Sequence, residues 1–152
     1  MIRRVCFVGA AAIAWLGLSA TPALAQVSFG PRAGLSGDPD QFFVGAHVES
    51  TDLGHKTTFR PNVEAGFGSD QTLITVNLGL VHWMPLKNSS WQAYAGGGIG
   101  TNFSIADEEK AMYGALHIVF GVQHDKGLFT EMKVGTEPSV KLTVGYSMKI
   151  GG

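Results

Sequence analysis

Five charged side chains on the polar face of the strands predicted below are the first candidates for a functional site. They are Arg32, Glu64, Glu131, Lys133 and Lys141. Charges that share a dry interior must pair with charges of opposite sign. The five residues could therefore form a buried polar cluster. Such a cluster would either be structural or exchange partners within a gated pore or a binding site.

A second group could support acyl transfer by a hydroxyl nucleophile. Its members are His117, His124, Asp125, Glu131, Ser139 and Ser147. A serine nucleophile needs a base within hydrogen-bond reach and a third group that orients the base. The strand assignment below puts His124 and Asp125 in a turn and puts no serine beside a histidine on the apolar face. We therefore predict no catalytic residues and no enzyme activity.

Metal and cofactor sites are not predicted. His47 and His117 fall on one face of their strands, but no cysteine or short ligand motif accompanies them. The glycine-rich stretch 95–100 lacks the Gly-Lys-Ser/Thr ending of a phosphate-binding loop and precedes no predicted helix. Its glycines fit bends and close packing in a curved sheet.

The elements that must position these residues are β-strands with two different faces. Between Val140 and Ile150 apolar residues alternate without interruption with polar residues or glycine, which is the period of a strand. Eleven residues tilted by about 40° would cross roughly 25–28 Å, the height of the apolar band on an outer-membrane barrel. The same pattern recurs along the chain. Eight strands are predicted at Val27–Leu35, Gln41–Glu49, Phe59–Gly68, Thr72–Met84, Trp91–Phe103, Ala111–Gln123, Leu128–Thr136 and Val140–Ile150.

An even number of such strands with short turns can close into an up-and-down antiparallel barrel. Alternation alone does not say which face is inside. The polar face is rich in Gly, Asn, Gln and Thr and has few charges, which suits a narrow lumen better than a water-facing surface. Aromatic residues near strand ends fit interfacial girdles. They are Phe42, Phe59, Phe67, Trp83, Trp91, Phe103 and Tyr146.

The first 25 residues have the features of an export signal. Arg3 and Arg4 precede the apolar stretch 5–18, and Ala23-Leu24-Ala25 forms a small-residue cleavage site. We expect residues 1–25 to be a signal peptide and residues 26–152 to be one barrel domain. Loss of the two arginines leaves nine basic and twelve acidic residues, a net charge near −3. That charge gives no electrostatic basis for nucleic-acid binding.

The mature sequence resembles the small outer-membrane β-barrels of the OmpA/OmpX-like superfamily. The resemblance rests on the signal ending 23–25 and on the strands 60–68, 93–100 and 142–146. It implies an eight-stranded barrel in the outer membrane of a Gram-negative bacterium, in contact with lipid and inserted by the barrel-assembly machinery. Members of the superfamily usually end in an aromatic residue, whereas this chain ends Lys149-Ile150-Gly151-Gly152.

Together these features predict a monomeric, non-catalytic outer-membrane barrel with a structural, interaction or narrow-pore role. A soluble periplasmic barrel that binds an apolar ligand in the manner of lipocalins is the alternative, and a barrel enzyme that modifies acyl chains of lipid A is a third. The orientation of residues such as Val144 separates the first two. If Val144 faces lipid, Val144→Arg blocks membrane assembly, and Thr143→Arg on the other face is the milder change.

Overall fold

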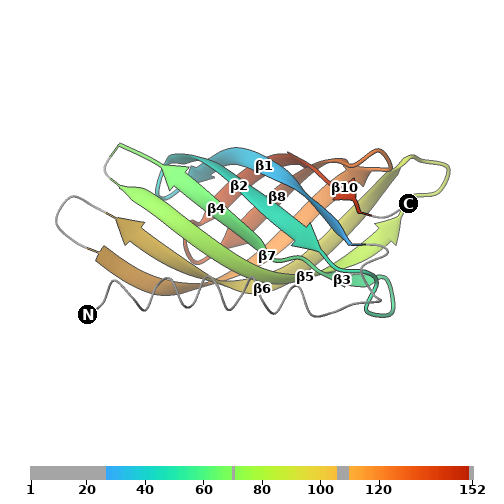
Figure 1. The fold of residues 1–152 in the computed structure, drawn as a ribbon, viewed down its shortest axis with the longest axis horizontal. Coiled ribbons are helices and arrows are strands. Elements are labelled where there is room, and N and C mark those ends of the chain that lie inside the picture. Colours follow the sequence, from blue (N-terminus) through green and yellow to red (C-terminus); the bar gives the residue numbers. More distant parts are fainter. Residues whose placement is uncertain (1–26, 70, 106–109, 151–152) are drawn as a thin grey trace.

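A single closed sheet forms the fold in the computed structural model, which describes residues 27–69, 71–105 and 110–150. The predicted signal peptide, residues 1–25, lies outside this part. The strands are β1 (Ser28–Gly37), β2 (Gln41–Glu49), β3 (Thr57–Phe59), β4 (Asn62–Phe67), β5 (Thr72–Pro85), β6 (Trp91–Ile105), β7 (Lys110–His124), β8 (Leu128–Gly135), β9 (Val140–Tyr146) and β10 (Met148–Lys149). Each pairs antiparallel with its neighbours (Figure 1). No helix in the described ranges is long and apolar enough to cross a membrane.

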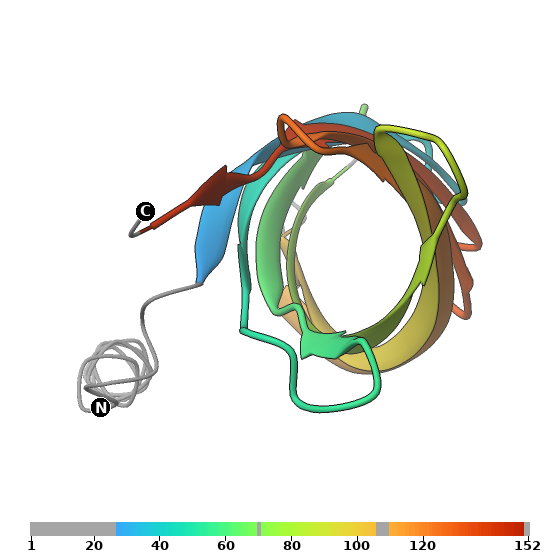
Figure 2. The same ribbon diagram turned by 90° about the vertical axis from the view of Figure 1, so that its right-hand side faces the viewer.

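The sheet closes through β1, which pairs with β2 on one side and with β9 and β10 on the other. β3 and β4 together occupy the third position of the barrel, and β9 and β10 together occupy the eighth. Viewed along the barrel axis, the strands form a ring (Figure 2). The predicted fold class, an eight-stranded antiparallel up-and-down barrel, is confirmed.

Two predicted strands are each divided into two. The third breaks at Arg60-Pro61 and the eighth at Ser147. Pro61 has no backbone N–H for the ladder. The second break lies across from Gly30-Pro31, the residues of β1 that separate its pairing with β10 from its pairing with β9. Pro31 again supplies no donor. The alternation of side chains continues through both breaks, so the barrel stays closed.

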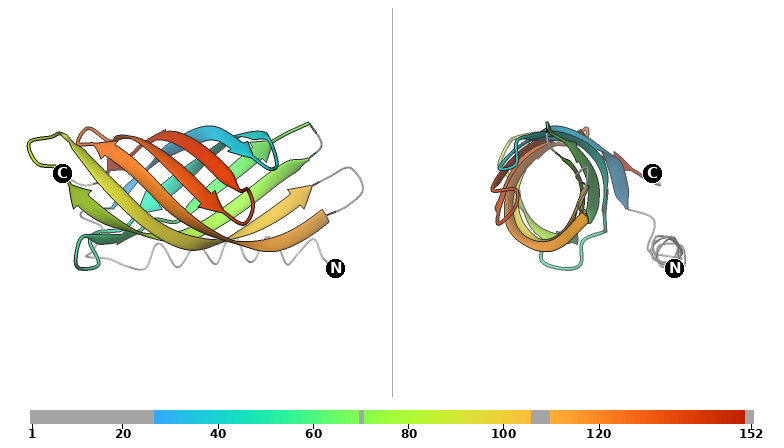
Figure 3. Two further views of the ribbon diagram at one scale, coloured as in Figure 1. Left: turned by 180° about the vertical axis from the view of Figure 1, so that it is seen from behind. Right: turned by 90° about the vertical axis from the view of Figure 1, so that its left-hand side faces the viewer.

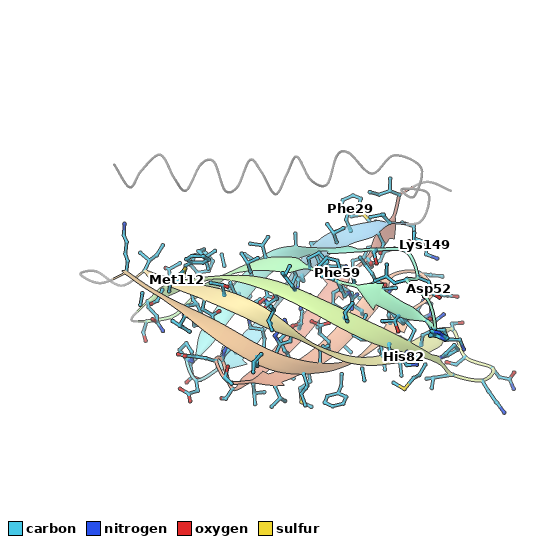
Figure 4. The ribbon with its side chains drawn as sticks, turned by 90° about the horizontal axis from the view of Figure 1, so that it is seen from below. Phe29, Asp52, Phe59, His82, Met112 and Lys149 are labelled. Carbon is cyan, nitrogen blue, oxygen red and sulfur yellow. The ribbon has the colours of Figure 1, made fainter. Side chains whose placement is uncertain are left out.

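The apolar face of the sheet is the outside of the barrel. Large apolar side chains stand exposed around the ring, including Leu116 at 62%, Val144 at 57% and Phe42 at 51%. Phe29, Phe59 and Met112 are three of these exposed residues and are labelled in Figure 4. A lipocalin-like barrel needs the reverse orientation, with these residues lining a cavity. The lipocalin-like alternative is therefore wrong, because the apolar face points outward.

One aromatic residue predicted for the girdles belongs instead to the interior. The Trp83 indole N–H donates to Thr58 Oγ1 over 3.0 Å, and its ring packs on Tyr94 at 4.8 Å between centroids. Phe42, Phe59, Phe67, Phe103 and Tyr146 are exposed on the outer face as predicted. Position near a strand end does not identify a girdle residue: Trp83 shares the parity of the buried Val81 on β5 and therefore faces inward.

The two ends of the barrel differ. Ser28 and Lys149 lie at one end, which we call the terminal end, together with Asp52 and the turns 86–90 and 125–127. Met112 lies near the opposite end (Figure 4). There β7 extends beyond β8 (Figure 3). The pairing of β7 with β8 begins only at His117, seven residues after β7 starts at Lys110.

Candidate functional site

A charged cluster crosses the middle of the lumen. Arg32 comes from β1, Glu64 from β4, Glu131 and Lys133 from β8, and Lys141 from β9. Each has the parity of the inner face, and each is at most 7% exposed. The structure thus brings together all five charged residues singled out in the sequence, from four different strands.

Glu64 is the centre of the first half of the cluster. Its carboxylate lies 2.9 Å from Arg32 Nε, contacts Lys141 Nζ directly and lies 4.0 Å from Lys133 Nζ. Three cations therefore surround one carboxylate in a space that water barely reaches. Such an arrangement is stable only while the negative charge is present, because removal of one partner leaves buried charges uncompensated.

Glu131 is the centre of the second half. It contacts Arg32 directly, lies 3.5 Å from Arg60 Nη1 and accepts a 2.8 Å hydrogen bond from the Tyr94 hydroxyl. Arg32 is therefore shared between Glu131 and Glu64. This bridging guanidinium connects β1, β4 and β8 across the barrel, whereas the sheet itself connects only neighbouring strands.

Arg60 and Glu49 belong to the same network, although the sequence prediction did not include them. Arg60 Nε lies 2.9 Å from Glu49 Oε2, and Arg60 Nη2 donates to Gln123 Oε1 over 3.0 Å. The guanidinium also lies 4.9 Å from the Tyr94 ring centroid and 4.6 Å from that of Phe129. Parity could have identified both charges, since Arg60 and Glu49 fall on the polar face of their strands.

Large apolar side chains fill the lumen beside the charges. Phe43, Tyr94 and Phe129 are at most 1% exposed and face inward. Lys141 Nζ lies 4.4 Å from the centroid of the Phe43 ring, a cation–π contact. Space for these rings comes from glycines on neighbouring strands. A Cβ atom at Gly121 would lie 2.3 Å from Tyr94 Cζ.

Amide and hydroxyl groups continue the polar network towards the opposite end. Asn77 Nδ2 donates to Asn62 Oδ1 over 2.9 Å, and Thr75 Oγ1 donates to Asn102 Oδ1 over 2.7 Å. All four residues are buried. Together with the charged cluster they fill the interior, as expected for a barrel of eight strands.

A polar vestibule opens at the terminal end, the end that faces the viewer in Figure 2. Its volume is about 580 Å³, and its walls include Glu49, Asp52, Trp83, Asp125 and Ser147. Glu49 belongs both to this vestibule and to the ion pair with Arg60. The vestibule therefore ends on the charged cluster.

The residues considered for acyl transfer are dispersed. His124 Nδ1 lies 2.6 Å from Asp125 Oδ1 in the turn after β7, and Ser139 Oγ donates to the Gly37 carbonyl over 3.3 Å. Glu131 belongs to the charged cluster. Ser147 does have a histidine neighbour, His47, whose Nε2 lies 3.2 Å from Ser147 Oγ. Both residues are buried on the inner face.

The two inward histidines have separate environments. The His47 ring packs edge-on against Phe129 at 5.0 Å, while His117 lines a small cavity beside Lys133. In the described part of the chain, no three His, Cys, Asp or Glu residues are grouped so that they could hold a metal ion.

The orientation of the two faces places the chain in a structural class: a closed eight-stranded barrel with an apolar exterior and a polar, filled lumen, which is the polarity of a membrane barrel. Within that class, it is similar to the crystal structure of the N-terminal β-barrel domain of Pseudomonas aeruginosa OprF. The TM-score is 0.59 and the sequence identity 10%, and the match covers 82% of this chain and 98% of that one.

At this identity the likeness concerns the fold, and the eight-stranded barrel fold expected from the sequence is confirmed. No protein-family model matches the chain, and no curated protein sequence matches it.

Proposed function

We propose that this protein is a non-catalytic barrel of the outer membrane whose lumen is closed by the charged cluster. The observation that carries the proposal is the distribution of polarity. Exposed Leu, Val, Ile, Phe and Met side chains cover the outer face, while seven charged residues are buried inside. In water this arrangement would expose an apolar surface far larger than soluble monomers tolerate. In a bilayer it matches the hydrocarbon.

The proposed role is structural or interactive rather than catalytic. The partners are outer-membrane lipid around a monomeric barrel and, during biogenesis, the barrel-assembly machinery. Partner proteins would meet the barrel at its ends, where the turns are.

A narrow-pore role is the second candidate, and the vestibule favours it. A space of about 580 Å³ leads from the terminal end to the ion pair of Glu49 and Arg60. Exchange of ion-pair partners could open a path beyond that point. Single-channel recording in planar bilayers separates the roles, since a structural barrel gives no conductance steps.

Fractionation tests the proposed location. The protein should partition with outer membranes, require detergent for extraction, and migrate differently on a gel before and after boiling. Recovery in the soluble periplasmic fraction would refute the proposal.

A pair of matched variants tests the orientation itself. Val144 and Val140 lie on the same face of β9, and both are exposed. Val144 lies midway along β9 and β10, whereas Val140 begins β9. An arginine at the bilayer midplane costs about 2–4 kcal/mol and near the interface about 0–1. Val144→Arg should reduce assembly strongly and Val140→Arg weakly; equal yields of the two would contradict a lipid-facing surface.

Thr143 is no longer the appropriate control for Val144. It is 1% exposed, and its Oγ1 lies 3.5 Å from Arg32 Nη2. Because Thr143→Arg would add a cation to a filled, cationic interior, we expect it to disturb the barrel as well.

A further inference from the structure

Among the described residues, the charges buried in the lumen do not balance. Four cations, Arg32, Arg60, Lys133 and Lys141, face three carboxylates, Glu49, Glu64 and Glu131, which leaves one positive charge in excess. All seven are at most 7% exposed. An uncompensated charge away from water is costly, so a filled lumen of this kind needs a further negative charge or the loss of a proton.

Lys133 is the cation with the weakest compensation. Its closest carboxylate atom, Glu64 Oε1, lies 4.0 Å away, and Glu64 already contacts Arg32 and Lys141. The Lys133 ammonium forms no hydrogen bond in the structure, and neither does Arg32 Nη1. Buried donors normally have partners. Two cationic donors therefore remain available on one side of the cluster.

A small cavity lies beside these donors. Its volume is about 20 Å³, and its walls include Arg32, Arg60 and Lys133 together with His117 and Glu131. A single water molecule needs at least about 10–15 Å³ of such space. The cavity therefore has room for one small species.

The Glu131 carboxylate does not leave this cavity negative, because three donors already bind it. They are Arg32 Nη2, Arg60 Nη1 and the Tyr94 hydroxyl. Three cations therefore line the cavity, and the donors described above already compensate its one carboxylate. A water molecule would use the free donors but would leave the excess charge in place.

We propose that this cavity is a binding site for one monatomic anion of the halide class, with the Lys133 ammonium and the Arg32 guanidinium as its donors. One such ion brings the charges of the lumen to zero. It also supplies the acceptor that both donors lack. The proposed anion site depends only on the lumen. Finding the protein in a soluble fraction would therefore refute the proposed function but would not decide whether the anion binds.

Bromide locates the site directly in the unmodified protein. The barrel is purified in detergent and crystallised with sodium bromide in place of chloride, and bromide is found by its anomalous scattering. The expected result is a peak in the cavity, in contact with Lys133 Nζ. Density for water there without an anomalous signal would overturn the proposal and would indicate a neutral Lys133 amine.

Thermal unfolding provides a second test in solution. Melting temperatures are compared in sodium chloride, sodium bromide and sodium gluconate at equal ionic strength. Halide at ten times its dissociation constant should raise the melting temperature by about 3–5 °C in a chain of this size. Sulfate at the same ionic strength should behave as gluconate does.

Two lysine variants separate a specific site from a general salt effect. Lys133→Met removes the excess charge and should abolish the halide shift. Lys126 is exposed in the turn between β7 and β8, so Lys126→Met should retain the full shift. A halide shift that survives in Lys133→Met would refute the site. If Lys133→Met does not fold, the bromide experiment still decides.

Discussion

Replacement of Glu64 by glutamine is the sharpest test of the charged cluster. The carboxylate compensates Arg32, Lys133 and Lys141, and its side chain is 1% exposed. Glutamine keeps the size of the side chain and removes only the charge. The excess positive charge of the lumen would rise from one to two, and only Arg32 would keep a second carboxylate partner, Glu131.

The expected loss of stability is large because water cannot replace the missing charge. Removal of one partner from a buried ion pair costs about 3–5 kcal/mol, several times the value of an exposed pair. We therefore expect Glu64→Gln to lower the free energy of unfolding by about 3–5 kcal/mol. Combining it with Lys141→Met removes a cation as well, restores the original charge balance and should recover at least about 1 kcal/mol.

Equilibrium unfolding in urea measures this effect, with the barrel in detergent or lipid vesicles and tryptophan fluorescence as the signal. Asp38→Asn is the matched control, because Asp38 is exposed in a turn and its φ of 54° suits asparagine. The control should stay within about 0.5 kcal/mol of the original protein. A Glu64→Gln barrel as stable as the control would refute the view that these charges are sealed from water.

Two further predictions concern a close approach in the lumen and a turn at the terminal end. Gly121→Ala should destabilise the barrel by about 1–3 kcal/mol, because the new Cβ would lie 2.3 Å from Tyr94 Cζ. Gly114→Ala on the same strand should be tolerated, since its nearest neighbour lies at 3.9 Å; equal midpoints in urea for the two variants would contradict this packing. Hydrogen bonds from the backbone N–H groups of Gly54 above all, and also of Thr57 and Lys56, lower the pKa of the Asp52 carboxyl below its usual value. A lowered pKa stabilises the turn above the unfolded pKa, and this effect is lost as pH falls through the folded pKa. The protection factors of the amides in residues 54–57, which compare each exchange rate with the intrinsic rate at the same pH, should therefore fall in acid, and Asp52→Asn should remove that pH dependence.

The positions of the strands and the grouping of side chains into two faces follow from the sequence alone. The period of two along 140–150 fixes which side chains share a face, and Arg32, Glu64 and Lys141 follow from parity alone. Their common location inside the barrel then follows from closure of the sheet. Local alternation carries this information because successive side chains of any strand point to opposite sides.

Only the tertiary structure decided which charges meet. Parity gives the face of a residue but not its height, which depends on the register of every strand pair. Arg32 reaches Glu64 and Glu131 across the lumen, although β1 pairs with neither β4 nor β8. The entry of Arg60 into the network and the cavity at Lys133 likewise depend on the diameter and shear of the closed barrel.

The direction of the faces also required the structure. The alternation of apolar Val144 with polar Thr143 is the same in a soluble barrel and in a membrane barrel. Closure with Val144 outward and Thr143 inward distinguishes them. Alternation in one strand does not tell in which direction the sheet curves, because curvature is a property of the whole sheet.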